Sequence, residues 1–504
     1  MRTVATLATG ALVASVAQAQ VVQWDIVRKH TGPKLTRRAG TFTEVITNEK
    51  VRGGYFASCS VGTPAQNLTL QLDTGSSDIW VPSSSASVCE QTSSSSDGCS
   101  LGSFDESESS TATVVGENEF SISYVDGSHS KGDYITDTFQ IGGAKLTNMT
   151  MGLGTSTDIP YGLVGVGYTL NEAIIGTTHS SSSQYDNLPV LMQKQGLIAT
   201  NAYSLWLNDL DASTGSILFG GIDTEKYKGD LTRINIQKDA SANAFTSFIV
   251  SMTSVQATSS SGTDTLSSAT FPIPVVLDSG TTFSYVPTDL ATEMWNEVGA
   301  EYYSEVGLAL LPCSMENSAG HFSFGFGGTG GPVINITMDE LVLPLTTGGA
   351  VTFPSGPNKG QEACQFGVQN FSSDSTTFLL GDTFMRSAYV VYDLVNNQIG
   401  LAPTDFNATK SNVVAFASEG AQMPSATAAP NQAAVSESAS TTTGSLGASG
   451  GFLNDKSSDG SSLPPPLDWS RIAVMGASMS LVLDKDGLDS SRGLRTLESE
   501  DEGE

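Results

Sequence analysis

The chain contains the stretch Leu72-Asp73-Thr74-Gly75-Ser76-Ser77-Asp78-Ile79-Trp80-Val81-Pro82, and about two hundred residues later it contains Leu277-Asp278-Ser279-Gly280-Thr281-Thr282-Phe283-Ser284-Tyr285-Val286-Pro287. The two stretches align without a gap, from the Leu-Asp at the start to the Val-Pro at the end. An internal repeat of this kind is typical of two homologous halves. The sequence therefore predicts two similar lobes, each of which supplies one carboxylate.

Both copies place the aspartate at the end of an apolar run. Residues 68–72 and 274–277 have the composition of strands that enter a core. The glycine two positions after each aspartate allows a sharp turn, and the neighbouring hydroxyl groups can hydrogen-bond a carboxylate or the opposite backbone. One Asp-Thr-Gly triplet is typical of an ordinary turn. Two copies with matched flanks predict instead that Asp73 and Asp278 work as a pair.

With this repeat the chain resembles the pepsin-like aspartic endopeptidases, in particular fungal secreted or cell-surface members of the yapsin-like type. The resemblance covers residues 52–403. It implies an all-β, bilobal fold, in which two homologous β-barrel-like lobes enclose an active-site cleft and Asp73 faces Asp278. It also implies that the protein needs no cofactor and no metal, and that protein or peptide substrates bind extended in the cleft.

The chemistry that follows from the resemblance is general acid–base catalysis. Two neighbouring carboxylates do not both ionise easily, so they share one proton over a broad acid range; aspartic proteases are the known example of this behaviour. The ionised carboxylate removes a proton from a water molecule, which attacks the scissile carbonyl while the other carboxyl group protonates its oxygen. We therefore expect hydrolysis at acid pH. The sequence does not decide which aspartate carries the proton.

A second feature is the alternating run at residues 120–128, which ends in Asp126-Gly127 and predicts a β-hairpin. In the family that the chain resembles, this hairpin is the flap that closes over the substrate. Tyr124 is then the flap tyrosine, and Trp80 is the expected hydrogen-bond partner of its hydroxyl. The resemblance assigns substrate binding to Tyr124, Gly75, Gly280, Thr281, Asp126 and Gly127, and support of the site to Ser76 and Trp80.

The composition limits the classes of function. The formal net charge of −29 argues against nucleic-acid binding, which needs a basic surface. The acidity is compatible both with solubility at neutral pH and with work in acid, where many carboxylates are protonated. A monomer is expected.

The ends of the chain differ in composition from the middle. Residues 1–19 have a basic start, an apolar centre and a small-residue ending, which is typical of a secretory signal, and Arg37-Arg38 is a candidate processing site. We expect a signal peptide at 1–19, a propeptide at 20–38, an N-terminal β lobe with Asp73 and the flap at 39–222, a C-terminal β lobe with Asp278 at 223–404, a Ser/Thr/Ala/Gly-rich stalk at 405–471, and a short apolar segment with an acidic tail at 472–504.

These ends predict a secreted, extracellular protein. The alternative is attachment to the cell surface by a GPI anchor, because a stalk followed by an apolar segment resembles a GPI signal. Residues 484–504 are strongly acidic, whereas a GPI signal ends in its apolar tail. Both the free and the anchored form therefore stay open, and membrane contact is expected only in the second.

Five cysteines leave one without a partner. By the habit of the family, we expect disulfides between Cys89 and Cys99 and between Cys313 and Cys364, and Cys59 as a buried thiol. A secreted chain is also open to N-glycosylation. Sequons stand at Asn67, Asn148, Asn335, Asn370 and Asn407.

Other classes of enzyme find weaker support. The four histidines are scattered without a metal-binding spacing. Residues 98–102 fit the Gly-x-Ser-x-Gly pattern of serine hydrolases, and residues 325–330 fit a dinucleotide fingerprint, but neither precedes a predicted helix. Two rivals remain, a glycosidase with paired carboxylates and an inactive pepsin-like binding protein.

Overall fold

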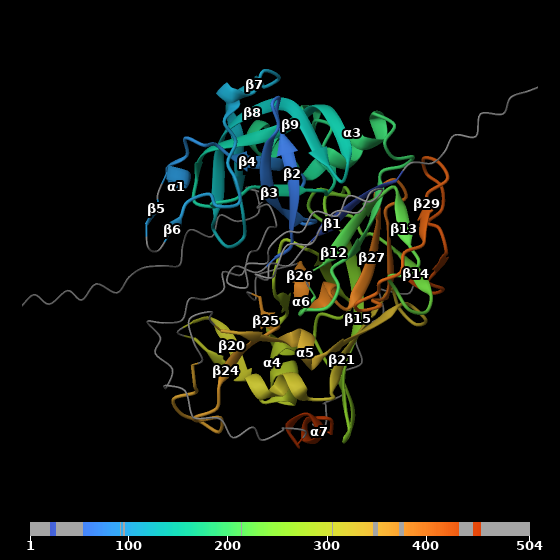
Figure 1. Cartoon of the computed structure of the whole chain (residues 1–504). Helices are drawn as coiled ribbons and strands as arrows, with labels where there is room; N and C mark the ends of the chain where they lie inside the picture. Colours follow the sequence, from blue (N-terminus) through green and yellow to red (C-terminus); the bar gives the residue numbers. More distant parts are fainter. Residues whose placement is uncertain are drawn as a thin grey trace, which may run out of the picture.

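The structure is a computed structural model that describes residues 21–26, 54–90, 92–93, 96–212, 214–304, 306–345, 351–371, 377–432 and 447–454. In these residues the protein consists mainly of β-strands, arranged as two lobes and a sheet between them (Figure 1). The expected all-β, two-lobed fold is confirmed. The expected signal peptide and the apolar segment with its acidic tail lie outside the described residues.

The N-terminal lobe is built on one seven-stranded sheet, drawn in blue to cyan in Figure 1. Residues 129–134 alternate between buried and more exposed side chains, as expected for a strand with one face on the core. The strands in spatial order are β2 (Phe56–Val61), β3 (Gln66–Asp73), β10 (Leu163–Gly165), β4 (Ile79–Pro82), β9 (Ala144–Thr157), β8 (His129–Ile141) and β7 (Thr113–Ser123).

The C-terminal lobe contains an eight-stranded sheet and a four-stranded sheet. The first follows the order β22 (Val333–Thr337), β21 (His321–Phe326), β15 (Ile249–Ser259), β17 (Ile273–Leu277), β26 (Phe378–Leu380), β18 (Ser284–Val286) and β25 (Val368–Asn370), with β16 (Gly262–Leu266) on β15. The second consists of β19 (Glu301–Tyr303), β20 (Leu308–Pro312), β24 (Ala363–Phe366) and β23 (Val342–Pro344).

A further seven-stranded sheet contains strands from both halves of the chain. Its first strand comes from the segment expected as a propeptide and pairs antiparallel with a strand of the N-terminal half. The order is β1 (Val22–Ile26), β12 (Gly215–Phe219), β11 (Ala202–Trp206), β27 (Ala388–Asp393), β28 (Gln398–Pro403), β14 (Leu231–Asn235) and β30 (Ala426–Ala428).

Smaller elements complete the fold. The remaining two-stranded pairs are β13 (Gly221–Asp223) with β29 (Val413–Ala415), and β5 (Thr92–Ser93) with β6 (Ser96–Asp97). The α-helices are α1 (Ser87–Glu90), α2 (Ala173–Thr178), α3 (Leu188–Lys194), α4 (Thr288–Val298), α5 (Met338–Leu341), α6 (Asp382–Met385) and α7 (Ser449–Asn454). No helix among the described residues has the length and apolar character needed to cross a membrane.

Part of the segment expected as a stalk is folded. Phe416 and Met423 are buried, β29 pairs with β13, and β30 extends the seven-stranded sheet by pairing with β14. Further on, α7 packs against α4, and its Phe452 ring stacks on Phe322 with 5.5 Å between ring centroids. The described residues between 405 and 454 therefore belong to the globular body and do not form a flexible stalk, because their scattered apolar side chains find places on its surface.

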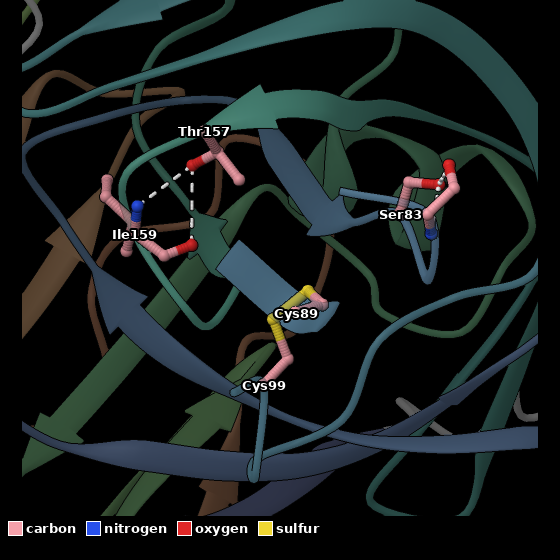
Figure 2. Close-up of a disulfide and its surroundings, with 6 residues drawn as sticks. Ser83, Cys89, Cys99, Thr157 and Ile159 are labelled. Carbon is pink, nitrogen blue, oxygen red and sulfur yellow. Dashed lines mark hydrogen bonds between the residues drawn. A yellow bond between two sulfur atoms is a disulfide. The ribbon is translucent and has the colours of Figure 1, made fainter. Parts of the chain in front are cut away.

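Two disulfides are present, Cys89–Cys99 and Cys313–Cys364. The first joins α1 to the loop that follows β6 (Figure 2). Figure 2 also shows the end of β9, where the Thr157 hydroxyl bonds the backbone of Ile159. Cys59 is buried in β2 and takes part in neither disulfide.

Candidate active site

The two repeated stretches meet at the centre of the molecule. β3 ends at Asp73, and β17 ends one residue before Asp278. A parallel strand supports each of them, since β10 places Gly165 opposite Asp73 and β26 places Leu380 opposite Leu277. The same local arrangement therefore occurs twice, once in each half of the chain.

The side chain that follows each aspartate crosses to the other half. The Thr74 hydroxyl donates to the Leu277 carbonyl (2.9 Å), and the Ser279 hydroxyl donates to the Leu72 carbonyl (3.1 Å). Each hydroxyl also accepts a backbone N–H from the opposite half, at 2.9 Å for Thr74 Oγ1 and 3.2 Å for Ser279 Oγ. These crossed bonds fix the relative position of the two aspartates.

Thr74 and Ser279 were not among the predicted site residues. The signal for them was present, because the repeat places a hydroxyl residue at both positions.

Both aspartates are fully buried, and their carboxylates are held in matching ways. Oδ1 of Asp73 accepts the Gly75 N–H and Oδ1 of Asp278 accepts the Gly280 N–H, both at 2.8 Å. The other oxygen of each accepts a hydroxyl, from Ser76 for Asp73 and from Thr281 for Asp278 (2.6 Å). Ser76 and Thr281 therefore have equivalent places on the two carboxylates.

The two carboxyl groups are close enough to interact directly. A Cβ atom built on Gly75 would lie 2.7 Å from the carboxyl carbon of Asp278, so only glycine leaves room for the opposite aspartate. Burial raises the pKa of both aspartates, and the charge of Asp278 raises the pKa of Asp73 further. The hydrogen bonds from Gly75, Gly280 and the two hydroxyls partly offset these rises. Such a pair holds one proton in acid.

The predicted hairpin is formed by β7 and β8, with a turn at residues 124–128. Tyr124 is buried and accepts a 2.7 Å hydrogen bond from Trp80 Nε1. Burial, and then the charge of Asp73, raises the pKa of Tyr124, so its hydroxyl keeps its proton. The Asp126 carboxylate accepts the N–H and hydroxyl of Ser128 within the turn.

Gly127 occupies the turn with a positive φ of 87°, a conformation that favours glycine. A Cβ atom there would meet no atom within 4 Å. Glycine is therefore favoured at this position by the backbone conformation and not by lack of space.

The histidines and the glycine-rich stretch noted in the sequence do not form a metal site or a dinucleotide-binding turn within the residues that the structure describes. In the described part of the chain, no group of three His, Cys, Asp or Glu side chains is arranged to hold a metal ion. The glycine-rich residues 325–330 lie in the connection from β21 to β22 and do not begin a helix.

Comparison with known proteins gives one consistent result. The eukaryotic aspartyl protease family matches residues 54–404. A probable aspartic-type endopeptidase opsB of Aspergillus oryzae is 38% identical, with 91% of this chain and 92% of that protein aligned. An acid protease of Saccharomycopsis fibuligera is 37% identical over 73% of this chain and 86% of its own length. Secreted aspartic protease 8 of Candida albicans is 38% identical over 74% of this chain and 81% of its own length.

Proposed function

Because this chain belongs to the eukaryotic aspartyl protease family and is a pepsin-like aspartic endopeptidase, we propose that Asp73 and Asp278 are its catalytic pair. The observation that carries the proposal is the two-fold arrangement around them, in which a glycine N–H and a hydroxyl hold each buried carboxylate. Protein or peptide chains are the substrates, and acid pH is the condition under which the pair holds one proton.

The reaction follows from the shared proton. The ionised aspartate takes a proton from a water molecule, whose oxygen forms a bond to the scissile carbonyl carbon. The protonated aspartate gives its proton to the carbonyl oxygen, which becomes the hydroxyl of a tetrahedral intermediate. The aspartate that took the proton from water then gives it to the leaving amine, and the carbon–nitrogen bond breaks. As the carbonyl re-forms, one hydroxyl of the intermediate returns its proton to the other aspartate. No covalent intermediate with the enzyme and no metal ion takes part.

Substrate binding is proposed for the flap hairpin and the two catalytic turns. Tyr124, Asp126 and Gly127 would close over an extended peptide, and closure excludes bulk water from the carboxyl pair. Gly75, Gly280 and Thr281 line the floor beside the aspartates. The Trp80 hydrogen bond sets the direction of the Tyr124 hydroxyl, so the closed flap has one preferred orientation.

The first experiment is cleavage of a denatured protein at acid pH by the processed enzyme. Asp73→Asn and Asp278→Asn should each lower kcat/KM at least about a thousandfold, because each removes one partner of the acid–base pair. Asp230→Asn, at an exposed aspartate, is the matched control. A statine-type transition-state inhibitor should block the wild-type enzyme. Substantial activity in either dyad variant would overturn the assignment.

We also propose that the protein is secreted as a monomer, with a signal peptide at 1–19 and a propeptide at 20–38. The relative from Candida albicans carries the word secreted in its name, which supports this. A GPI anchor on the cell surface is the alternative. N-terminal sequencing of protein from culture medium tests the processing at Arg38, phospholipase C treatment of cells tests the anchor, and gel filtration tests the monomer.

Glycosylation of the sequons is proposed from their exposure. Asn370 is half-buried, and its Nδ2 lies 3.5 Å from the Thr288 hydroxyl. We therefore expect the lowest occupancy at Asn370, measured by mass spectrometry before and after removal of N-glycans. The asparagines of the other four sequons, Asn67, Asn148, Asn335 and Asn407, are exposed.

A further inference from the structure

Besides the two proposed catalytic aspartates, a further carboxyl group is buried close to the turn that follows Asp73. Asp78, five residues after Asp73, is fully buried. Its Oδ1 accepts hydrogen bonds from the hydroxyls of Tyr134 (3.2 Å) and Tyr185 (2.7 Å), and its Oδ2 accepts the Ala173 N–H (2.8 Å). Three donors, one from β8 and two from residues 173–185, therefore converge on one side chain.

Tyr134 connects this carboxyl group to the flap hairpin. It lies in β8, and its ring packs edge-on against Phe120 and Tyr185, with 5.4 Å and 5.7 Å between ring centroids. Phe120 lies 6.3 Å from Trp80, and Trp80 donates its hydrogen bond to Tyr124. A continuous line of aromatic rings thus joins the buried carboxyl group to the flap tyrosine.

Tyr185 and Ala173 connect it to the segment of residues 168–187, which contains α2. This segment lies against the catalytic turn, because Asn171 Nδ2 donates to the Gly75 carbonyl at 3.1 Å. On the other side, α2 lies against β7 of the flap hairpin. The 168–187 segment therefore touches both the floor of the active site and one strand of its cover.

Glu172 lies in the same segment, next to Ala173, and is also buried. Its Oε2 accepts the Tyr185 N–H at 2.8 Å, and among the described residues no donor reaches its Oε1. Burial, followed by the charge of Asp78, raises the pKa of Glu172 to about 10. Glu172 is thus neutral in acid.

We propose that Asp78 is a positioning residue for peptide hydrolysis, which acts through Tyr134 on the flap hairpin and through Tyr185 and Ala173 on the 168–187 segment. The inference rests on the proposed function and extends it to a residue outside the catalytic pair. Its physical basis is that closure aligns the flap with the carboxyl pair, and small errors in alignment lower the rate steeply.

The carboxyl group suits this place better than an amide. An asparagine must direct its oxygen to the Ala173 N–H, because two N–H donors do not bond each other. Its NH₂ group then faces both tyrosine hydroxyls and reverses the direction of both hydrogen bonds. The buried hydroxyl protons of Tyr134 and Tyr185 lose their acceptor, which is unfavourable. Asp78→Asn should therefore loosen the flap and the 168–187 segment together.

The test compares Asp78→Asn with Asp137→Asn, which makes the same exchange at a buried carboxyl group outside the 168–187 segment. Asp137 also accepts two side-chain hydroxyls, from Ser109 and Thr111, and one backbone N–H. Active sites are titrated with a tight statine-type inhibitor, so that misfolded molecules do not count. At acid pH, kcat per titrated site should fall about ten- to a hundredfold in Asp78→Asn and stay at the wild-type value in Asp137→Asn. A wild-type kcat in Asp78→Asn, or an equal loss in both variants, would overturn the inference.

A second pair of variants covers the case in which Asp78→Asn does not fold. Tyr134→Phe and Tyr185→Phe keep the rings and remove one hydroxyl each. The double variant should lower kcat per titrated site at least about fivefold, and it should speed hydrogen exchange in residues 120–134. An unchanged kcat in the double variant would overturn the inference. A wild-type enzyme that the inhibitor does not titrate would instead overturn the proposed catalytic pair, so the two failures are distinguishable.

Discussion

Glu172→Gln should make the protein more stable at neutral pH while leaving its stability in acid unchanged. Glu172 is 2% exposed, and burial and the charge of Asp78 raise its pKa from the ordinary value of 4.5 to about 10. A carboxyl group with a raised pKa stabilises the fold fully below pH 4.5. That contribution is lost as the pH rises toward 10, because the unfolded chain ionises and the folded chain does not.

The size of the effect follows from the two pKa values. One pH unit corresponds to about 1.4 kcal/mol for a single group. Between pH 4.5 and pH 7, Glu172 therefore lowers the free energy of unfolding of the wild-type protein by about 3 kcal/mol. Glutamine has no proton to lose and keeps the acceptor for the Tyr185 N–H. The variant should match the wild-type protein at pH 4.5 and exceed it by about 3 kcal/mol at pH 7.

The measurement is urea unfolding at several pH values, followed by tryptophan fluorescence. Both proteins carry Asp278→Asn, so that self-digestion does not occur. Glu117→Gln, at an exposed residue of the same lobe, controls for the loss of one charge. A difference between the Glu172 variant and its parent that stays constant from pH 4.5 to pH 7 would refute the reasoning.

Three further predictions concern the proposed catalytic pair and the interior. Because burial raises the pKa of Asp73 and Asp278, kcat/KM should be highest in acid and fall as the second proton leaves; a pH–rate profile that stays flat well above neutrality would contradict the shared proton. Gly75→Ala places a methyl group 2.7 Å from the Asp278 carboxyl carbon, so kcat/KM should drop at least about a hundredfold in the peptide assay. Arg386 forms a buried ion pair with Glu340. Arg386→Met should therefore lower the free energy of unfolding, measured by urea titration, by about 3–5 kcal/mol, and adding Glu340→Gln should recover part of this loss. An unchanged free energy of unfolding in Arg386→Met would show that the ion pair is dispensable.

The fold and the meeting of Asp73 with Asp278 were predictable because the information is local and occurs twice. Each copy combines an apolar strand, an aspartate and a glycine turn within about ten residues, and the repetition removes the ambiguity of a single turn. The hairpin of β7 and β8 was predictable for the same reason, because the alternation of apolar and polar residues and the Asp-Gly turn are also local signals.

The Asp78 cluster was not predictable in this way. Its hydroxyl donors stand 56 and 107 residues further along the chain, and no periodicity connects them. A carboxylate between Ser77 and Ile79 is indistinguishable in sequence from a solvated one. Only the three-dimensional packing reveals that it is fully buried.

The folded parts of the C-terminal segment, at residues 405–432 and 447–454, were missed for a different reason. Average composition over residues 417–466 is polar and rich in small side chains, which is typical of a flexible stalk. Single apolar residues such as Met423 and Phe452 nevertheless dock on the protein surface. A few well-placed contacts anchor a segment whose average gives no sign of them.

The crossed hydroxyl bonds at Thr74 and Ser279 have a mechanical consequence. They tie the two lobes at the point where the two aspartates meet, and Gln71 adds a third tie to the Gly280 carbonyl. If the two lobes rotate relative to each other, these bonds place the axis of rotation at the two aspartates. The displacement of an atom grows with its distance from the axis. The two ends of a bound peptide would therefore move, while its scissile bond stays almost fixed.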